Sequence, residues 1–353
     1  MTSLVNSYQL CDAFDLLARL PDASVDLIAT DPPYFGIVAE GWDNQWDTLA
    51  DFSAWVERLA VEFRRVLKPH GALYWFADDK RAAYCQLALD RHFRLVNSLV
   101  WDKPATQSCI GIENNLRSYA IHTERILFYE QTGASALTAT GLEVIHSLPE
   151  CFTSIKAYMR AERDKVKTAN GWKTQKEFDA WCCQVTGTSS MVARHCFCDS
   201  QFALPTPEQY RALQSSGFFS RPYDALRAEY DALRAEHDAL RRPWNNDPRA
   251  REILSFSLDS GTFHPTQKPL ALMRYLLARS TRPGFVVLDP FGGSATTAAA
   301  AISLGLDFIS CERDPRYHAA ALARLDAQRL LPRIPHPCEA LRPPSPTQIF
   351  LPL

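Results

Sequence analysis

The sequence contains no apolar run that approaches the roughly 18 residues needed to span a membrane. Its first residues also lack the charged and apolar regions of a signal peptide, so we expect a cytoplasmic protein. No excess of one charge sign is present either, because 38 Lys and Arg face 40 Asp and Glu, which leaves a formal net charge of -2. That balance excludes a global attraction to nucleic acid or acidic lipid, and any basic surface must be local.

Ten cysteines are present, but the sequence lacks the paired C-x-x-C spacing that is typical of structural zinc sites. The densest group comprises Cys182, Cys183, Cys196 and Cys198. Without a secretory signal reduced thiols are the default, so we predict neither a disulfide framework nor a metal site. Hydrophobic residues at 46% and charged residues at 22% are typical of a folded protein, and 353 residues suffice for two domains or one domain with a large insertion.

Short β-branched or aromatic runs alternate with helical stretches at both ends of the chain, as in a mainly parallel sheet covered by helices. We predict strands over residues 25–30, 72–76, 95–101, 125–129, 285–289 and 306–310. An amphipathic helix is predicted over 51–67. The sequence therefore predicts an α/β fold with a Rossmann-like doubly wound sheet, built from residues 1–150 and 258–330.

Residues 151–257 have few continuous apolar runs and many helix formers, so we predict an inserted, mainly helical domain. Between residues 155 and 176 it carries seven basic side chains against two acidic ones, which indicates either a solvated helix face or a phosphate-binding surface. Residues 181–197 place Gly187 between two apolar-periodic segments, a pattern that resembles a helix-turn-helix.

A short internal repeat over residues 224–240 places Leu226, Leu233 and Leu240 seven residues apart. Fewer than three heptads favour one amphipathic helix packed on its own domain over an independent coiled coil. The last segment, 331–353, is rich in proline and is predicted to be a flexible tail.

The tetrapeptide Asp31-Pro32-Pro33-Tyr34 follows directly on the first predicted strand, at the carboxyl end of the sheet, where open α/β sheets bind ligands. Its prolines remove competing N–H donors, which leaves the Asp31 carboxylate and the Pro32 carbonyl facing one small donor. An exocyclic amino group of a base fits this pair, and Tyr34 supplies a flat face for stacking. Taken alone, such a tetrapeptide would be a strand-ending turn with a capping Asp.

A second block, D-P-F-G-G-S-A-T-T, begins at Asp289, after a predicted strand, and opens an Ala-rich helix. Gly292 and Gly293 permit the tight turn and the close backbone approach that a cofactor needs. Glu312 ends the next strand, at roughly the 20-residue offset where an acidic side chain meets ribose hydroxyls in Rossmann-like units.

A third block, H-P-T-Q-K-P, begins at His264 and precedes an amphipathic helix. Its His, Thr and Lys side chains are suited to holding a carboxylate. Because His264 has no metal-ligand partner nearby in sequence, we predict no metal site there.

Together these blocks resemble the DNA amino-methyltransferases that use S-adenosylmethionine, specifically the permuted beta group. In that group the D-P-P-Y block comes first, a target-recognition region follows, and the H-P-T-Q-K-P and F-x-G-x-G blocks come last, which is the order found here. The resemblance covers about residues 1–130 and 258–325. Leu99 to Lys103 and His122 to Tyr129 also look like minor blocks of this family.

The resemblance implies two sets of site residues. The target base would be bound and activated by Asp31, Pro32, Pro33 and Tyr34. S-adenosylmethionine would be bound by Asp12, His264, Thr266, Lys268, Asp289, Phe291, Gly292, Gly293 and Glu312. In the second set the Asp289 block would hold the methionine end, Glu312 the ribose, Thr266 and Lys268 the cofactor carboxylate, and Asp12 the adenine.

Two positions depart from the family pattern. Cys11 stands where a glycine usually precedes Asp12, and Ala295 replaces the last glycine of F-x-G-x-G. Because alanine is small, we expect Ala295 to weaken cofactor binding only moderately.

We predict that the chain methylates the 6-amino group of adenine in double-stranded DNA. The base must be flipped out of the duplex, and the methyl group would move in one in-line displacement at the sulfonium carbon. Two alternatives are methylation of the 4-amino group of cytosine and, more distantly, a non-catalytic DNA-binding relic of the fold.

We predict that the insertion selects the DNA sequence. Lys165 and Lys167 would grip phosphates, and Arg194 and His195 would reach base edges. The competing interpretation is a homodimer built on the helix that carries Leu226, with the DNA sequence read by the loop of Trp42 and Trp46.

Overall fold

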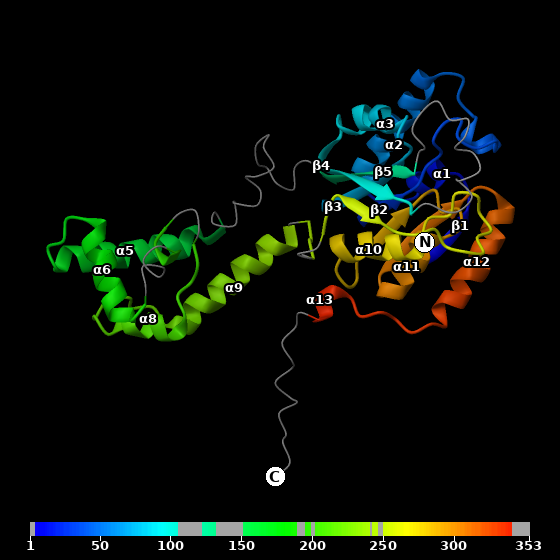
Figure 1. Ribbon diagram of the computed structural model, residues 1–353. Helices are drawn as coiled ribbons and strands as arrows, with labels where there is room; N and C mark the ends of the chain where they lie inside the picture. The colour runs from blue at the N-terminus through cyan, green and yellow to red at the C-terminus, as the bar shows by residue number, and fades with distance from the viewer. Residues whose placement is uncertain are drawn as a thin grey trace, which may run out of the picture. The chain divides into compact units, whose positions relative to one another are not determined.

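The computed structural model describes residues 4–104, 122–131, 151–188, 195–198, 202–240, 242–245 and 250–340. The chain divides into two compact units (Figure 1). One, the sheet unit, is drawn from Met1–Ala134 and Arg242–Leu353, and the other, the helical unit, from Ser135–Arg241. The sheet unit is thus discontinuous in sequence, with the helical unit inserted between its two segments.

A single sheet of eight strands organises the described part of the sheet unit. Its strands are β1 (Ser7–Leu10), β2 (Val25–Thr30), β3 (Leu67–Ala77), β4 (Phe93–Asp102), β5 (Thr123–Gln131), β6 (Ile253–Ser255), β7 (Val286–Asp289) and β8 (Asp307–Glu312). Their order across the sheet is β1-β8-β7-β2-β3-β5-β4-β6. Strand β5 runs antiparallel to β3 and β4, and the other neighbours are parallel, so the predicted α/β, mainly parallel sheet is confirmed.

Helices cover both faces of the sheet, as expected of a doubly wound fold. They are α1 (Ala13–Ala18), α2 (Leu49–Val66), α3 (Ala82–Leu89), α10 (Leu270–Ser280), α11 (Thr296–Leu304), α12 (Pro315–Arg329) and α13 (Pro337–Ala340). One apolar core joins the sheet to α1, α2 and α3, and a second joins it to α10, α11 and α12 (Figure 1). Helix α2 begins at a capping box between Thr48 and Asp51, which fixes the direction in which the chain leaves the loop after β2.

All six predicted strands are present, but β1 and β6 were not predicted from the sequence. They have only four and three residues, too few for alternation of side chains to be recognisable. Strand β6 also moves the boundary of the insertion. It pairs with β4, and Asn245 donates to the carbonyls of Ala278 and Thr281, so the second segment of the sheet unit begins at Arg242 and not at residue 258.

The predicted flexible tail is wrong for residues 331–340. Ile334 donates its backbone N–H to Ser303 at 2.7 Å, and buried His336 lies 3.1 Å from the hydroxyl of Thr281. The prolines of this segment end the regular helix without preventing the chain from packing on the sheet unit. Residues 341–353 lie outside the described residues.

The helical unit has a core of its own. Its helices are α5 (Thr153–Ala169), α6 (Gln175–Thr186), α8 (Pro207–Gln214) and α9 (Tyr223–Leu240). Leu226 of α9 is fully buried in that core, and the Tyr230 ring stacks on Phe152 at 4.2 Å between centroids. The prediction of one amphipathic helix packed on its own unit is therefore confirmed for α9.

The predicted helix-turn-helix is only partly described. Helix α6 ends at Gly187 in the left-handed conformation, but residues 189–194 lie outside the described residues. Cys182 and Cys196 are buried among aromatic side chains of the core. Within the described ranges, the structure contains no group of three metal-ligating side chains that could hold an ion.

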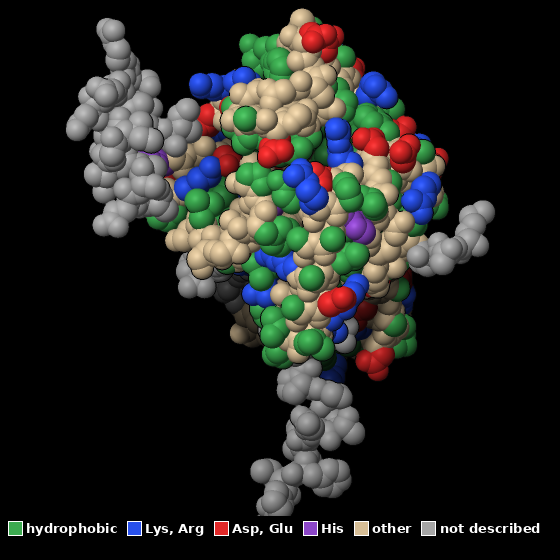
Figure 2. All heavy atoms as spheres, turned by 90° about the vertical axis from the view of Figure 1, so that its right-hand side faces the viewer, with side chains coloured by type: hydrophobic (Ala, Val, Ile, Leu, Met, Phe, Trp, Pro, Cys, Tyr) green, Lys and Arg blue, Asp and Glu red, His purple; other side chains and the backbone are tan. Residues whose placement is uncertain are grey.

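Every helix in the described part of the chain is too short or too polar to cross a membrane. On the face shown in Figure 2, acidic and basic side chains are interspersed among hydrophobic ones. This mixture agrees with the near-zero net charge of the sequence.

Asp26, a buried carboxylate in β2, joins three strands. It lies 2.9 Å from the ammonium of Lys68 and 2.8 Å from Nε2 of His70, and it accepts the backbone N–H of Val286 at 2.9 Å. Burial by itself raises the pKa of Asp26, but these hydrogen bonds outweigh burial and the net pKa lies below the usual value. Asp26 therefore stabilises the junction of β2, β3 and β7 in its ionised form.

We expect Asp26→Asn to lower the free energy of unfolding by about 2 kcal/mol at pH 7, because the amide loses the charge-assisted bonds. Since the folded-state pKa lies below the unfolded value of about 3.9, this stabilisation is present above about pH 4 and is lost as the pH falls through the folded pKa. Urea unfolding at several pH values measures both effects. Asp22→Asn, which removes an exposed partner of Arg65, is the control and should change little. Equal losses in the two variants would contradict the assignment.

Candidate active site

The main pocket of the sheet unit opens where β2 and β7 end. These strands are neighbours, with Leu27 paired to Val287 and Ile28 to Leu288, so the residues that follow each strand meet at one edge of the sheet. The hydroxyl of Thr30 donates to Asp289 at 2.8 Å and ties the two strand ends together. The expected adjacency of the strands that lead to Asp31 and Asp289 is confirmed.

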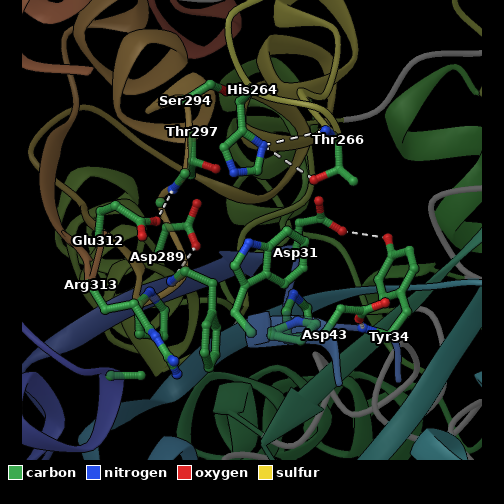
Figure 3. Close-up of a pocket in the computed structure, with 18 of the residues that line it drawn as sticks. Asp31, Tyr34, Asp43, His264, Thr266, Asp289, Ser294, Thr297, Glu312 and Arg313 are labelled. Atoms are coloured by element: carbon green, nitrogen blue, oxygen red, sulfur yellow. Dashed lines mark hydrogen bonds between the residues drawn. The ribbon is translucent and has the colours of Figure 1, made fainter. Parts of the chain in front are cut away.

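Every residue predicted for catalysis or cofactor binding lines this one pocket (Figure 3). They are Asp12, Asp31, Pro32, Pro33, Tyr34, His264, Thr266, Lys268, Asp289, Phe291, Gly292, Gly293 and Glu312. Segments separated by more than 200 residues in sequence thus form one site. Their individual roles stay predictions.

Both oxygens of the Asp31 carboxylate already accept hydrogen bonds from the protein. The hydroxyl of Tyr34 donates to Oδ1 (Figure 3). The ammonium of Lys268 lies 2.5 Å from Oδ2. Burial raises the pKa of Asp31, and the nearby cation of Lys268 only partly opposes this rise. The pocket therefore keeps Asp31 poorly solvated and strongly basic for a carboxylate.

Lys268 contacts a second carboxylate, Glu124, which the sequence prediction placed in a minor family block without a role. Its ammonium is 3.3 Å from Oε2 of Glu124 and is almost fully buried. Burial lowers the pKa of Lys268, but the two carboxylates outweigh burial and raise it, so Lys268 is a cation at neutral pH. In this structure its ammonium faces Asp31 and Glu124, which differs from the predicted position at a cofactor carboxylate.

At the other end of the pocket, the buried Asp289 and the half-buried Glu312 present carboxylates (Figure 3). Burial raises the pKa of Asp289 to about 6, although Thr30 and the N–H of Phe291 donate to it. Glu312 accepts the N–H of Gly293 at 3.0 Å, and burial also raises its pKa. Two desolvated carboxylates side by side favour a ligand with a cationic group and hydroxyl donors.

Glycine is favoured at two positions of the turn after β7, for a different physical reason at each. A Cβ at Gly292 would come within 2.5 Å of the Ser310 hydroxyl, so only glycine fits there. Gly293 has a positive φ of 50° and lies against the ring of His264. Ala295, the departure from the family pattern, also adopts the left-handed conformation, with φ of 60°. It is buried and does not line the pocket, so its cost is backbone strain of about 1 kcal/mol rather than lost cofactor contact.

His264 forms an aromatic wall of the pocket. Its ring stacks against Trp42 with centroids 6.1 Å apart and meets Tyr317 edge-on at 4.4 Å. Burial, helped by the nearby Lys268 cation, lowers the pKa of His264 to about 4, so the ring is neutral at pH 7. Its Nδ1 accepts weak hydrogen bonds from Thr266 (Figure 3).

Asp43 organises the loop after Tyr34, and sequence analysis missed it. Its buried carboxylate accepts four backbone N–H groups, from Tyr34, Phe35, Ile37 and Val38, at 2.6 to 2.9 Å. This network fixes the backbone of a loop that lines the pocket. An acid in a loop has no signal in sequence that separates it from a solvated side chain, so only the fold reveals this function.

Asp12 and the tryptophans near Asp43 have structural partners as well. Asp12 caps α1 by accepting the N–H of Phe14 at 2.9 Å while it lines the pocket. The half-buried Trp46 packs against the core, with its ring centroid 5.0 Å from that of Phe52. The half-buried Trp42 lines the pocket. The alternative that assigned DNA recognition to this loop stays a prediction.

The residues predicted to bind DNA belong to the helical unit. Lys165 is exposed and pairs with the buried carboxylate of Glu162 at 2.6 Å. Lys167 lies half-buried in the last turn of α5, and His195 is described while Arg194 lies outside the described residues.

Comparison with known proteins identifies relatives of the whole chain. The DNA adenine methyltransferase YhdJ of Escherichia coli (strain K12) is 26% identical over 320 residues, which is 89% of this chain and 81% of that protein. The solved structure of PvuII DNA methyltransferase, described as cytosine-N4-specific, is 15% identical, with a TM-score of 0.51 over 92% of this chain and 86% of that one. TTHA0409 of Thermus thermophilus, solved with S-adenosyl-L-methionine, is 19% identical, with a TM-score of 0.48 over 92% of this chain and 95% of that one.

A family model described as DNA methylase, N6_N4_Mtase, matches residues 25–323. The matched range begins at β2 and ends within α12, so it includes both carboxyl-end blocks of the pocket and the helical insertion between them. The chain therefore belongs to the family of S-adenosylmethionine-dependent DNA amino-methyltransferases, which have the class I methyltransferase fold.

Proposed function

We propose that this enzyme methylates the 6-amino group of adenine in double-stranded DNA. The observation that carries the proposal is the position of Asp31, at the carboxyl end of β2 and beside the end of β7. There Asp31 and the glycine turn after β7 share one pocket. Adenine is supported by the D-P-P-Y block and by a relative named as an adenine methyltransferase.

The pocket residues fit S-adenosylmethionine. Asp289 offers an anion for the amino-acid ammonium, Glu312 offers acceptors for ribose hydroxyls, and Phe291 supplies an apolar surface. Gly292, where a side chain would collide with Ser310, keeps the backbone of this turn close to the sheet. When bound, the cofactor supplies an electrophilic methyl group on a sulfonium.

Asp31 makes the amino group of the base a better nucleophile. Its carboxylate and the Pro32 carbonyl accept the two amino protons, which reduces delocalisation of the nitrogen lone pair into the ring. The nitrogen then attacks the methyl carbon, so that an N–C bond forms as the S–C bond breaks. The positive charge left on nitrogen is removed when one proton passes to Asp31 or to water. Burial, which raises the pKa of Asp31, favours this acceptance.

Cytosine remains the second candidate target, since the same acceptors can hold a 4-amino group. The fold similarity to PvuII DNA methyltransferase, described as cytosine-N4-specific, is compatible with it. Nucleoside analysis of the methylated DNA by mass spectrometry decides between the two. N6-methyladenine is the expected product, and N4-methylcytosine would replace our proposal.

We expect Asp31→Ala to reduce methyl transfer by about a thousandfold or more, because the acceptor of the amino proton is lost. Cofactor binding should stay within about threefold of the unmodified enzyme, since Asp289 and Glu312 are unchanged. Transfer of labelled methyl groups measures the first effect and calorimetry the second. Near-normal turnover in this variant would refute the mechanism, and an unmodified enzyme that does not bind the cofactor would support the relic alternative.

We expect cofactor affinity to depend on pH through Asp289. Its pKa of about 6 means that it protonates as the pH falls below 6, and the neutral acid cannot pair with the cofactor ammonium. Affinity should be level from pH 7 to about 6.5 and then fall, approaching tenfold per pH unit below pH 5. Calorimetry between pH 5 and 7 measures this slope. In Asp289→Asn the dependence of cofactor affinity on pH should become weaker, because only Glu312 still contributes to it. An unchanged dependence would contradict the role that we assign to Asp289.

We also propose that the helical unit recognises the DNA sequence, with Lys165 and Lys167 on phosphates and with Arg194 and His195 at base edges. The support is the concentration of basic side chains over residues 155–176 in an otherwise balanced chain. Phosphate contacts give affinity without sequence information, whereas base contacts discriminate. Because Lys165 neutralises the buried carboxylate of Glu162, its variants need an unfolding control.

Replacing Lys165 and Lys167 together by glutamine should weaken binding to all DNA sequences. We expect the slope of log affinity against log salt to decrease by about two, one for each lost phosphate contact. Fluorescence anisotropy across a salt series measures the slope. Arg211→Gln, an exposed change on α8 of the same unit, is the matched control. A slope equal to that of the control would show that these lysines do not contact DNA phosphates.

A further inference from the structure

Asp31 and Glu124 share the same two hydrogen-bond donors. The hydroxyl of Tyr34 donates to Oδ1 of Asp31 and lies 3.2 Å from Oε2 of Glu124. The ammonium of Lys268 is 2.5 Å from Oδ2 of Asp31 and 3.3 Å from the same Oε2 of Glu124. Two carboxylates thus face one ammonium and one hydroxyl, with the shorter contacts on Asp31.

The two donors weaken Asp31 as an acceptor for the target amino group. They use two of the roughly four lone-pair positions of the carboxylate, and the positive charge of Lys268 lowers the basicity of the oxygens that must accept an amino proton. Lys268 cannot simply withdraw, because a buried ammonium without a partner costs several kcal/mol. Only 6% of its side chain is exposed, so solvent does not offer an alternative partner.

Glu124 is placed to accept the donors when they leave Asp31. It lies on β5, within reach of the same two donors as Asp31, and its other oxygen, Oε1, is held 2.5 Å from the ammonium of Lys103. Burial alone raises the pKa of Glu124, but Lys268 and Lys103 outweigh it and the net pKa is lowered. Glu124 is therefore ionised at neutral pH and ready to bind a cation. A small shift of the Lys268 ammonium toward Glu124 shortens their present 3.3 Å contact and moves the cation away from Asp31.

We propose that Glu124 is a positioning residue for methyl transfer: it draws the Lys268 ammonium away from Asp31 when the target base enters, and so makes Asp31 a stronger acceptor for the amino group. The inference rests on the proposed function of Asp31. Glu124 does not touch the reacting atoms and acts through Lys268. Its removal should therefore slow the transfer step without weakening the binding of either substrate.

The test is Glu124→Gln, which keeps the shape and hydrogen-bonding capacity of the side chain but removes its charge. We expect the single-turnover rate of methyl transfer to fall between about 10-fold and 100-fold, as for the loss of one positioned catalytic interaction. Dissociation constants for S-adenosylmethionine and for DNA should change less than about threefold. Glu124→Asp, which retains the charge, should recover a measurable part of the rate.

The matched control is Glu130→Gln on the same strand. Glu130 has the same side-chain exposure, 14%, and pairs with Arg94 and Arg242, away from Asp31. This variant should retain the rate of the unmodified enzyme. If Glu124→Gln and Glu130→Gln lose the same small amount, Glu124 has only a structural role and the inference is wrong.

A double-mutant cycle tests the route of action. When Lys268 has been changed to Met, no ammonium remains to be moved, so adding Glu124→Gln should reduce the rate by less than about threefold more. A full additional loss would show that Glu124 acts independently of Lys268 and would overturn the inference. Failure of the proposed function is recognised separately, because the unmodified enzyme would then yield no methylated adenine.

Discussion

The site depends on the parallel pairing of β2 with β7, two strands from opposite ends of the chain. Pairing Leu27 with Val287 places Asp31 and Asp289 at the same edge of the sheet, and the Thr30 hydroxyl bonds the two strand ends. In one step this contact joins the Asp31 block to the turn after β7, to which we assign base binding and cofactor binding. Without it, each block is an ordinary strand-ending loop. The helical insertion between them can therefore vary in sequence without altering the distance between nucleophile and methyl donor.

Strand β2 shows how one element can carry a structural and a functional carboxylate. Asp26, within the strand, receives hydrogen bonds from three donors and has a lowered pKa. For Asp31, just after the strand, burial affects the pKa more than the hydrogen-bond donors do, and the pKa is raised. The first carboxylate stabilises the fold. The second holds a charge that is incompletely satisfied, which is the condition for accepting a proton from a substrate.

The pocket contains several buried charges that would be unfavourable in isolation. Asp289, Glu312 and Asp31 all have raised pKa values, and burial is the largest cause in each case. The cost is tolerated because fixed groups surround the pocket: Asp43 anchors the loop after Tyr34 through four N–H donors, and the glycine turn packs against Ser310. Among the groups of the pocket, Lys268 contacts two carboxylates and is the one to which we assign a movement.

Local sequence patterns were sufficient for much of this molecule. Strand β2 was predicted with its observed bounds, because a run of buried apolar residues ending at Asp-Pro-Pro has an unambiguous signal. The candidate residues of the three blocks were also predicted to form one site, and they line one pocket. Tertiary structure decided the rest. Glu124 acquires its contacts only when strand β5 comes beside Tyr34 and Lys268. Asp43 acquires its contacts only when the loop after β2 folds back on itself. Strand β6 and the packing of residues 331–340 depend in the same way on partners far away in the sequence, β4 and the end of α10. Periodicity reports the environment along one segment, whereas these features come from which segments become neighbours.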